Sequence, residues 1–330
     1  VVLGRGGFAA DTAPEGSLVA VPDGDGGWVV GATPAEARLS AGRVQGRRTT
    51  AGAVPPLEAP DGDWEAVLRT PWVEPAYLET DAAWCEPGGR PCSPLANGGA
   101  FGAKLESVAP AAARELADEH GRPVLVVLSR EDTVRMGAKR PPVSGGARAD
   151  GTGVLRVVRT PGIVEAVAAV APGLVVEEVD VAGPPTSSSI RAAGWAEAVV
   201  LLTGAGAMDG PVVSPDGASA TAAVGDDGIS VTVRCGDPLD ATVLRSYCVG
   251  AAHMAWSWIT SEALSVDGDG TVHDLTVRSF GVVRATDTPT ISVVIEDDDG
   301  EPVNGSDAVF AAVAAATWCH RGRPHELPTG

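Results

Sequence analysis

Basic residues are scarce in this sequence. Lysine and arginine together number 24, against 43 aspartates and glutamates, so the formal net charge is −19 at pH 7. Because contacts to phosphate groups require clustered cations, we expect no nucleic-acid partner. The excess of acidic residues instead indicates a well-solvated surface.

Long apolar stretches are also missing. No apolar run approaches the roughly 20 residues that a membrane-spanning helix needs. Residues 1–16 lack the basic and apolar segments of a secretory signal. We therefore expect a cytoplasmic protein without a membrane segment. Hydrophobic residues still make up 44% of the 330, which is enough to build a substantial core.

The cysteines and histidines lack the spacing of a metal site. None of the five cysteines forms a CxxC pair, and the five histidines form no HExxH pattern. An odd number of cysteines without a secretory signal favours reduced, mostly structural thiols. We expect no metal ligands and no iron–sulfur cluster on this chain.

Helical and strand patterns alternate along the chain, which predicts an α+β fold. One helix start is well marked, with Thr33 as the cap, Pro34 at the first helical position and Glu36 at the third. The helical patterns are at residues 33–44, 107–121, 244–266 and 307–322. The strand patterns are at residues 122–132, 229–238, 273–283 and 290–300. We interpret residues 196–210 as β-rich or mixed and residues 211–228 as a linker or loop.

The stretch LANGGAFGAKLES, residues 95–107, has an unusually bare backbone. Gly98, Gly99 and Gly102 can adopt positive φ and allow another surface to approach the main chain. This composition suits a loop that cradles a phosphate or a cofactor edge, and it suits equally a tight turn beneath a packed helix. Phe101 is expected to pack in either case.

The motifs that follow this loop resemble a known family. From residue 98 the chain reads GGAFGAKLES, then a helix, then GRPVLVVLSREDTVRMGAKRPP. This order resembles the molybdopterin-binding large subunit of the xanthine dehydrogenase/aldehyde oxidase family. Further stretches resemble family motifs in the same order: GRGGFAAD at 4–11, LRTPWVEPAYLETDAAW at 68–84, SSIRAAGWAE at 188–197, the helix and strand at 247–277, DGEPVNGSDAVFAAVAAATW at 299–318 and RGRPHELP near the end.

The resemblance implies an α+β fold of mixed α/β domains in a condensed form. It implies an N-terminal β-rich, hammerhead-like remnant at residues 1–60. A first molybdopterin-binding-like domain would span residues 61–200, and a second, condensed one residues 201–330. The family subunits are more than twice as long, so internal blocks are missing here.

The resemblance also assigns roles to particular residues. By analogy the loop Gly98, Gly99, Ala100, Phe101 and Gly102 would contact molybdopterin, together with Arg191. Glu301 would be the general base of the hydroxylation. No residue of this chain is expected to bind a metal ion directly.

Several positions depart from the family pattern. Met254 stands where the family has a glutamine that hydrogen-bonds the cofactor, and a thioether cannot replace an amide. Pro75 replaces a histidine and Ala193 an aromatic residue, and the GQG cofactor loop has no counterpart between residues 198 and 229. Asp297 to Asp299 precede Glu301 with only Gly300 between them, which is typical of a solvated turn.

Two functions therefore remain open. In the first, the chain is an accessory, structural subunit of a molybdenum hydroxylase, without a cofactor of its own. It would dock on a full-length molybdopterin subunit or on the iron–sulfur and flavin subunits, which would carry [2Fe-2S] and FAD. In the second, the chain itself binds molybdopterin cytosine dinucleotide with Mo and hydroxylates an aldehyde or an N-heterocycle.

Overall fold

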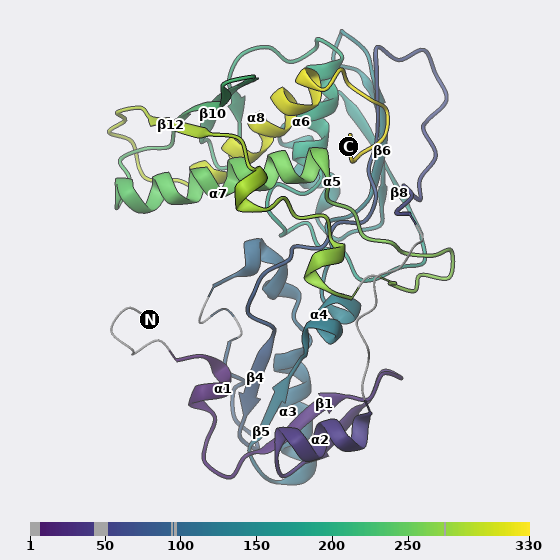
Figure 1. Cartoon of the computed structure of the whole chain (residues 1–330), viewed down its shortest axis with the longest axis vertical. Helices are drawn as coiled ribbons and strands as arrows, with labels where there is room; N and C mark the ends of the chain where they lie inside the picture. The colour runs from purple at the N-terminus through teal and green to yellow at the C-terminus, as the bar shows by residue number, and fades with distance from the viewer. Residues whose placement is uncertain (1–6, 43–51, 94, 96–97, 274) are drawn as a thin grey trace.

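Three four-stranded sheets organise the chain in a computed structural model, which describes residues 7–42, 52–93, 95, 98–273 and 275–330. One sheet belongs to a smaller lobe and two belong to a larger lobe (Figure 1). Helices pack on all three sheets, so the predicted α+β class is confirmed.

The smaller lobe is built on a sheet with the strand order β2-β1-β5-β4. β1 and β5 are parallel, with Leu18 opposite Val124, while the outer pairs are antiparallel. Helix α3 packs on β4 and β5, and its alanines bury small apolar surfaces against them. The elements of this lobe are α1 (Ala9–Thr12), β1 (Leu18–Pro22), β2 (Trp28–Gly31), α2 (Pro34–Ala41), β4 (Ala82–Cys85), η2 (Ala100–Glu106), α3 (Ala109–His120), β5 (Val124–Val127) and α4 (Arg130–Met136).

The larger lobe contains a sheet of order β3-β6-β7-β8 and a sheet of order β12-β11-β10-β9. Its strands are β3 (Ala66–Arg69), β6 (Val143–Ala147), β7 (Gly153–Val158), β8 (Leu174–Val179), β9 (Val212–Val213), β10 (Ser219–Gly225), β11 (Gly228–Arg234) and β12 (Ile291–Ile295). Its helices are α5 (Ile163–Ala168), α6 (Trp195–Gly204), α7 (Ala241–Thr260), η3 (Val277–Ser279), η4 (Ala285–Asp287) and α8 (Gly305–His320).

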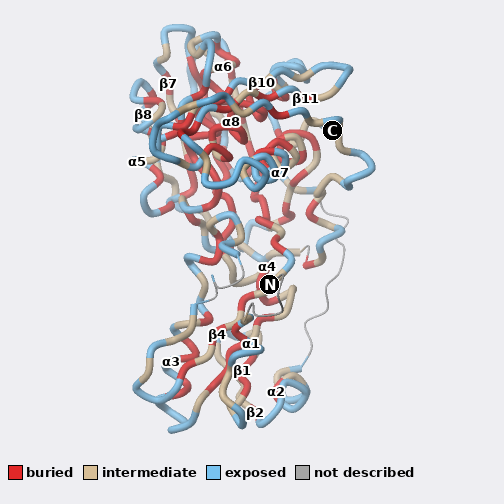
Figure 2. Tube along the Cα trace, turned by 90° about the vertical axis from the view of Figure 1, so that its left-hand side faces the viewer, coloured by how far each residue is buried: buried red, intermediate tan, exposed pale blue. Residues whose placement is uncertain are grey.

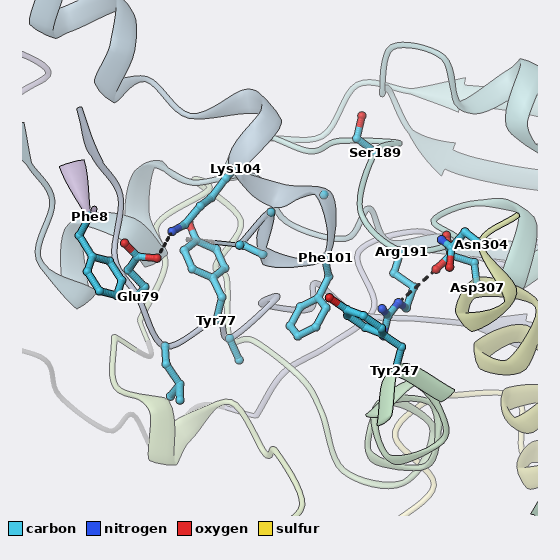
Figure 3. Close-up of a pocket in the computed structure, with 16 residues that line it drawn as sticks. Phe8, Tyr77, Glu79, Phe101, Lys104, Ser189, Arg191, Tyr247, Asn304 and Asp307 are labelled. Carbon is cyan, nitrogen blue, oxygen red and sulfur yellow. Dashed lines mark hydrogen bonds and ion pairs between the residues drawn. The ribbon is translucent and has the colours of Figure 1, made fainter. Parts of the chain in front are cut away.

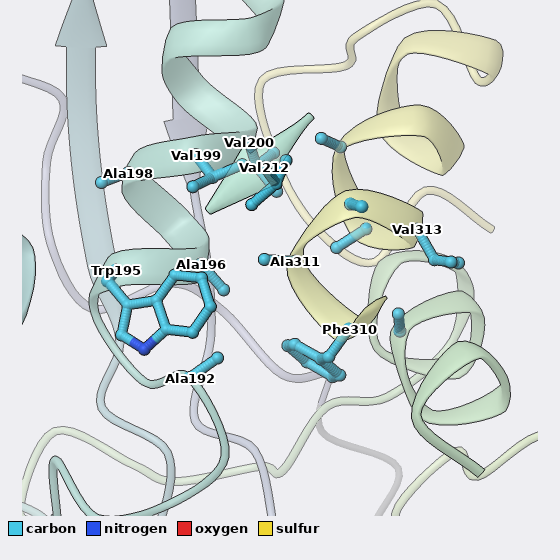
Figure 4. Close-up of a cluster of buried hydrophobic side chains, with 14 of the residues drawn as sticks. Ala192, Trp195, Ala196, Ala198, Val199, Val200, Val212, Phe310, Ala311 and Val313 are labelled. Carbon is cyan, nitrogen blue, oxygen red and sulfur yellow. The ribbon is translucent and has the colours of Figure 1, made fainter. Parts of the chain in front are cut away.

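Helices α6 and α8 lie between the two sheets of the larger lobe. α6 packs on β3 and β6, α8 packs on β10, and the two helices contact each other. Buried residues are concentrated along these helices (Figure 2), and Figure 4 shows Ala196 of α6 facing Ala311 of α8. Alanines at this contact let the two helices approach closely, so the core is dense although aromatic residues are few.

Helix ends follow the sequence signals closely. The Thr33 hydroxyl accepts a hydrogen bond from the Glu36 amide, and the Glu36 carboxylate accepts one from the Ala32 amide. α3 ends at Gly121, which has a φ of 60°. The predicted helices at 33–44, 107–121, 244–266 and 307–322 are confirmed as α2, α3, α7 and α8, and residues 43 and 44 of the first prediction lie outside the described residues.

Three other interpretations were wrong. Residues 196–210 are not β-rich, because most of them form α6, a helix buried on nearly every side and therefore without an amphipathic period. The expected linker at 211–228 contains β9 and β10. The described residues of the expected strand at 273–283, which exclude residue 274, are irregular apart from the short helix η3.

Strand pairing groups distant parts of the sequence. The sheet of the smaller lobe combines residues 18–31 with residues 82–85 and 124–127. The proposed division at residues 60 and 200 stays a prediction, and the family resemblance remains its basis.

Candidate functional site

The bare loop predicted from the sequence lies on a large cavity. The volume of this cavity is about 780 Å³, and its wall comes from both lobes (Figure 3). Besides the loop, its wall includes the segment that precedes β4, the segment that precedes α6, and the first residues of α8. The lining residues used below are Leu78, Glu79, Gly98–Gly102, Lys104, Ser189, Arg191, Tyr247 and Asp307.

The loop itself is folded tightly onto the chain. Phe101 has a φ of 58° and Gly102 a φ of 98°, both in the left-handed region. A Cβ atom on Gly102 would lie 1.7 Å from the carbonyl oxygen of Ser189, so no other residue fits there. The Arg191 amide donates a hydrogen bond of 2.8 Å to the Phe101 carbonyl. The close approach that these residues permit is therefore made by the chain's own backbone.

The Arg191 guanidinium contacts four other side chains. Its Nε donates to Asp307 at 3.2 Å, its Nη1 contacts Met254 Sδ at 3.2 Å, and its Nη2 donates to Ser306. The guanidinium lies over the Phe101 ring, 5.0 Å from the ring centroid. Burial lowers the pKa of Arg191, and the Asp307 carboxylate partly offsets this effect.

The second cation of the cavity is paired too. Lys104 is 2% exposed, and its Nζ lies 3.1 Å from the Glu79 carboxylate. It also lies over the ring of Tyr77, whose hydroxyl donates to Asp81. Burial and the Asp81 carboxylate raise the pKa of Tyr77, so the phenol stays protonated. Figure 3 shows one ion pair at each end of the cavity.

Glu301 lies apart from the other predicted site residues. Its side chain is exposed, and it is not among the residues that line the large cavity. Nearby, Asp298 accepts hydrogen bonds from Arg234 and from the Gly236 amide. The structure thus brings Gly98–Gly102 and Arg191 together but does not bring Glu301 to them.

A smaller cavity shares part of its wall with the first and was not predicted from the sequence. Its volume is about 190 Å³, and Ala76, Phe101 and Arg191 line both cavities. Its other lining residues include Val73, Glu74, Arg140, Ile190, His253, Met254, Trp258, Glu262, Val282 and Phe310. Phe101, Arg191 and Met254 are positions that the resemblance relates to the cofactor, whereas no motif in the sequence marked Glu262.

Arg140 forms a buried centre beside this smaller cavity. Its guanidinium binds both carboxylate oxygens of Glu197, at 2.6 and 2.8 Å. It also lies over the stacked rings of Trp258 and Phe310, at 4.3 and 4.9 Å. A planar guanidinium suits such simultaneous ion pairing and stacking, so Arg140 joins α6, α7 and α8.

Solved structures show which fold this architecture resembles. The fold is that of the molybdenum hydroxylases, as the motifs predicted. One similar structure is quinoline 2-oxidoreductase from Pseudomonas putida 86, with a TM-score of 0.53 and 8% sequence identity. The match covers 99% of this chain and 95% of that chain. An identity this low shows the fold alone.

Two further similarities are partial. CO dehydrogenase from Oligotropha carboxidovorans matches with a TM-score of 0.28 and 10% identity, over 55% of this chain and 35% of that chain. Aldehyde oxidoreductase from Desulfovibrio gigas matches with a TM-score of 0.26 and 14% identity, over 54% of this chain and 33% of that chain. Both TM-scores are too low to support an argument. No protein-family profile and no curated protein matches the sequence.

Among the described residues, no three His, Cys, Asp or Glu side chains gather in a way that could hold a metal ion. No helix there combines the length and the apolar character needed to cross a membrane.

Proposed function

We propose that this chain is an accessory, structural subunit of a molybdenum hydroxylase complex and holds no cofactor of its own. The observation that carries the proposal is the pairing of both cavity cations, Lys104 with Glu79 and Arg191 with Asp307. A molybdopterin dinucleotide contains a pyrophosphate, which binds to cations that are free to approach it. Because each cation here already has a carboxylate partner, the residues of the cavity do not fit that group.

The loop and the thioether support the same proposal. Gly102 lies against the Ser189 carbonyl, so the close approach that this glycine permits is made by the chain's own backbone. Met254 accepts from Arg191 and has no amide to offer. A buried pterin would leave many polar atoms without partners at such a surface.

Exposed apolar side chains support a docking role. Leu78 and Tyr247 line the large cavity and are 88% and 59% exposed. Large apolar groups gathered around one opening mark interaction surfaces. We propose that a full-length molybdopterin subunit covers this opening in the cytoplasm. Iron–sulfur and flavin subunits, carrying [2Fe-2S] and FAD, would complete the complex.

Metal analysis of the separated chains tests the proposal. The complex is isolated from its host through this chain and its subunits are then separated. Molybdenum and released pterin are expected on a larger copurifying chain and not on this one. About one molybdenum atom per copy of this chain would overturn the proposal.

One observation favours the alternative that the chain is catalytic. Gly98–Gly102 and Arg191, the contacts that the resemblance assigns to molybdopterin, line the same cavity. In that case the bound cofactor would supply the redox chemistry, and Glu301 would act as the base. Substrate turnover by this chain alone, lost in Glu301→Gln, would establish this second function.

A further inference from the structure

The smaller cavity has the size and the lining of a ligand site. Its volume of about 190 Å³ exceeds the about 150 Å³ of an engineered apolar cavity that binds benzene. Most of its wall is apolar and includes Phe101, Trp258 and Phe310. One aromatic ring with a short substituent would therefore fit.

The charges around this cavity are balanced except at one position. Glu74 lies 2.9 Å from the Lys139 ammonium, Arg140 binds Glu197, and Arg191 binds Asp307. The fourth charged lining residue, Glu262, has no cation within ion-pair distance among the described residues. Glu262 is only 9% exposed. A carboxylate buried this deeply is costly unless a cation or a hydrogen-bond donor faces it.

The neighbours of Glu262 compensate its charge incompletely. Burial raises its pKa from the ordinary 4.5 to about 7, although a hydrogen bond from Ser257 and the charge of Arg140 act in the opposite direction. Burial also lowers the pKa of His253, whose Nδ1 lies 2.9 Å from the Thr288 hydroxyl. His253 is therefore neutral at neutral pH and adds no positive charge to the cavity.

We propose that this cavity binds a small, mainly apolar molecule that carries one protonated amine, with the Glu262 carboxylate as its counter-ion. The aromatic and aliphatic wall takes the body of the ligand, and the amine supplies the missing positive charge. The cavity adjoins the large one, because Phe101 lines both spaces and is 40% exposed. This proposal does not depend on whether the chain is catalytic.

Two probes of the same shape test the proposal on the full chain. Benzylamine carries the required charge, whereas benzyl alcohol is its neutral counterpart. Binding is followed by the fluorescence of the tryptophans, which include Trp258 in the wall, and by calorimetry near pH 8. We expect saturable binding of benzylamine that is about tenfold or more tighter than that of benzyl alcohol. Equal binding of the two probes, or no saturable binding of benzylamine, would overturn the proposal.

Variants assign the effect to one side chain. Glu262→Gln is expected to weaken benzylamine about tenfold or more and to leave benzyl alcohol unchanged. Glu106→Gln, which changes an exposed carboxylate, is the matched control and should change neither. Unchanged benzylamine affinity in Glu262→Gln would contradict the assignment.

The pH profile gives a second route if Glu262→Gln does not fold. Affinity for benzylamine should rise between about pH 5 and pH 8 as Glu262 loses its proton. Of the other charged or titratable groups that face the cavity, Glu74, Arg140 and Arg191 have ion-pair partners, so His253 is the competing candidate. His253→Gln should keep the profile, and loss of the profile in that variant would remove Glu262 from the proposal.

Discussion

Arg191 and Phe101 contact each other twice. The Arg191 amide donates to the Phe101 carbonyl at 2.8 Å, and the guanidinium lies 5.0 Å from the centroid of the Phe101 ring. The same two residues line both cavities. Because a main-chain hydrogen bond and a stacked side chain fix this contact together, the two spaces share one well-defined wall.

The Asp307→Asn substitution removes the ion pair between Arg191 and Asp307 and keeps the arginine. Asp307→Asn should leave the cation uncompensated on the large cavity and create affinity for inorganic pyrophosphate. We expect a gain of about tenfold over the parent, corresponding to about 1.4 kcal/mol, measured by calorimetry at low salt. Asp287→Asn, at an exposed ion pair with Arg284, is the control. No gain in Asp307→Asn would show that carboxylate pairing is not what limits anion binding.

Gly102 should tolerate no side chain. Gly102→Ala would place a Cβ 1.7 Å from the Ser189 carbonyl oxygen at a φ of 98°. We expect a loss of about 2–5 kcal/mol in the free energy of unfolding, from backbone strain and overpacking together. Gly206→Ala is a matched control, because its φ is 75° but nothing lies within 4 Å of the added Cβ. Equal losses in urea unfolding would contradict the importance of the Ser189 contact.

Glu262 should make the stability depend on pH in an unusual direction. Its pKa is raised from 4.5 to about 7, so the folded state holds a proton that the unfolded state releases. The stabilisation by this proton is complete below about pH 4.5 and is lost as the pH rises to about 7. Glu262→Gln should therefore unfold with a free energy up to about 3 kcal/mol higher than the parent near pH 8.

Comparison at a second pH provides the check. Near pH 4.5 the parent carboxyl is protonated in the folded state and about half protonated in the unfolded state, so the advantage of Glu262→Gln should nearly vanish. Urea unfolding of both proteins at the two pH values measures this difference. A constant difference at both pH values would mean that Glu262 is not the titrating group.

The exposed side chains around the large cavity should matter for assembly and not for folding. Leu78 is 88% exposed, and Leu78→Glu should weaken association by about 1.5–3 kcal/mol if a partner buries it. The measurement is the amount of molybdenum-containing chain recovered with the tagged variant. Leu39→Glu, at an exposed leucine on α2 in the smaller lobe, should recover as much as the parent. Equal recovery with Leu78→Glu would place the partner elsewhere.

Local signals in the sequence predicted local structure well. The start of α2 at Thr33 and the end of α3 at Gly121 depend on residues within one turn, which the sequence displays directly. The apolar run in α6 misled the interpretation, because a helix buried on all sides loses the 3.6-residue period that distinguishes it from a strand.

The site could be predicted only in part for a related reason. Gly98–Gly102 and Arg191, which the motifs assign to one site, line the same cavity although these segments are far apart in the chain. The ion pair of Arg191 with Asp307 joins residues 116 positions apart, and no pattern in the sequence near either residue indicates it. Ion pairs between residues distant in the sequence depend on how the whole fold packs. They therefore cannot be predicted from any single segment.

The strand order of the smaller lobe has a consequence for synthesis on the ribosome. β5 lies between β1 and β4, so β4 cannot pair with the rest of this sheet until residues 124–127 have left the exit tunnel. Until then the edge of β1 that pairs with β5 is exposed. A nascent chain with an unpaired strand edge is prone to incorrect association. Chaperone occupancy during translation should therefore be highest before β5 emerges and should fall once it has inserted.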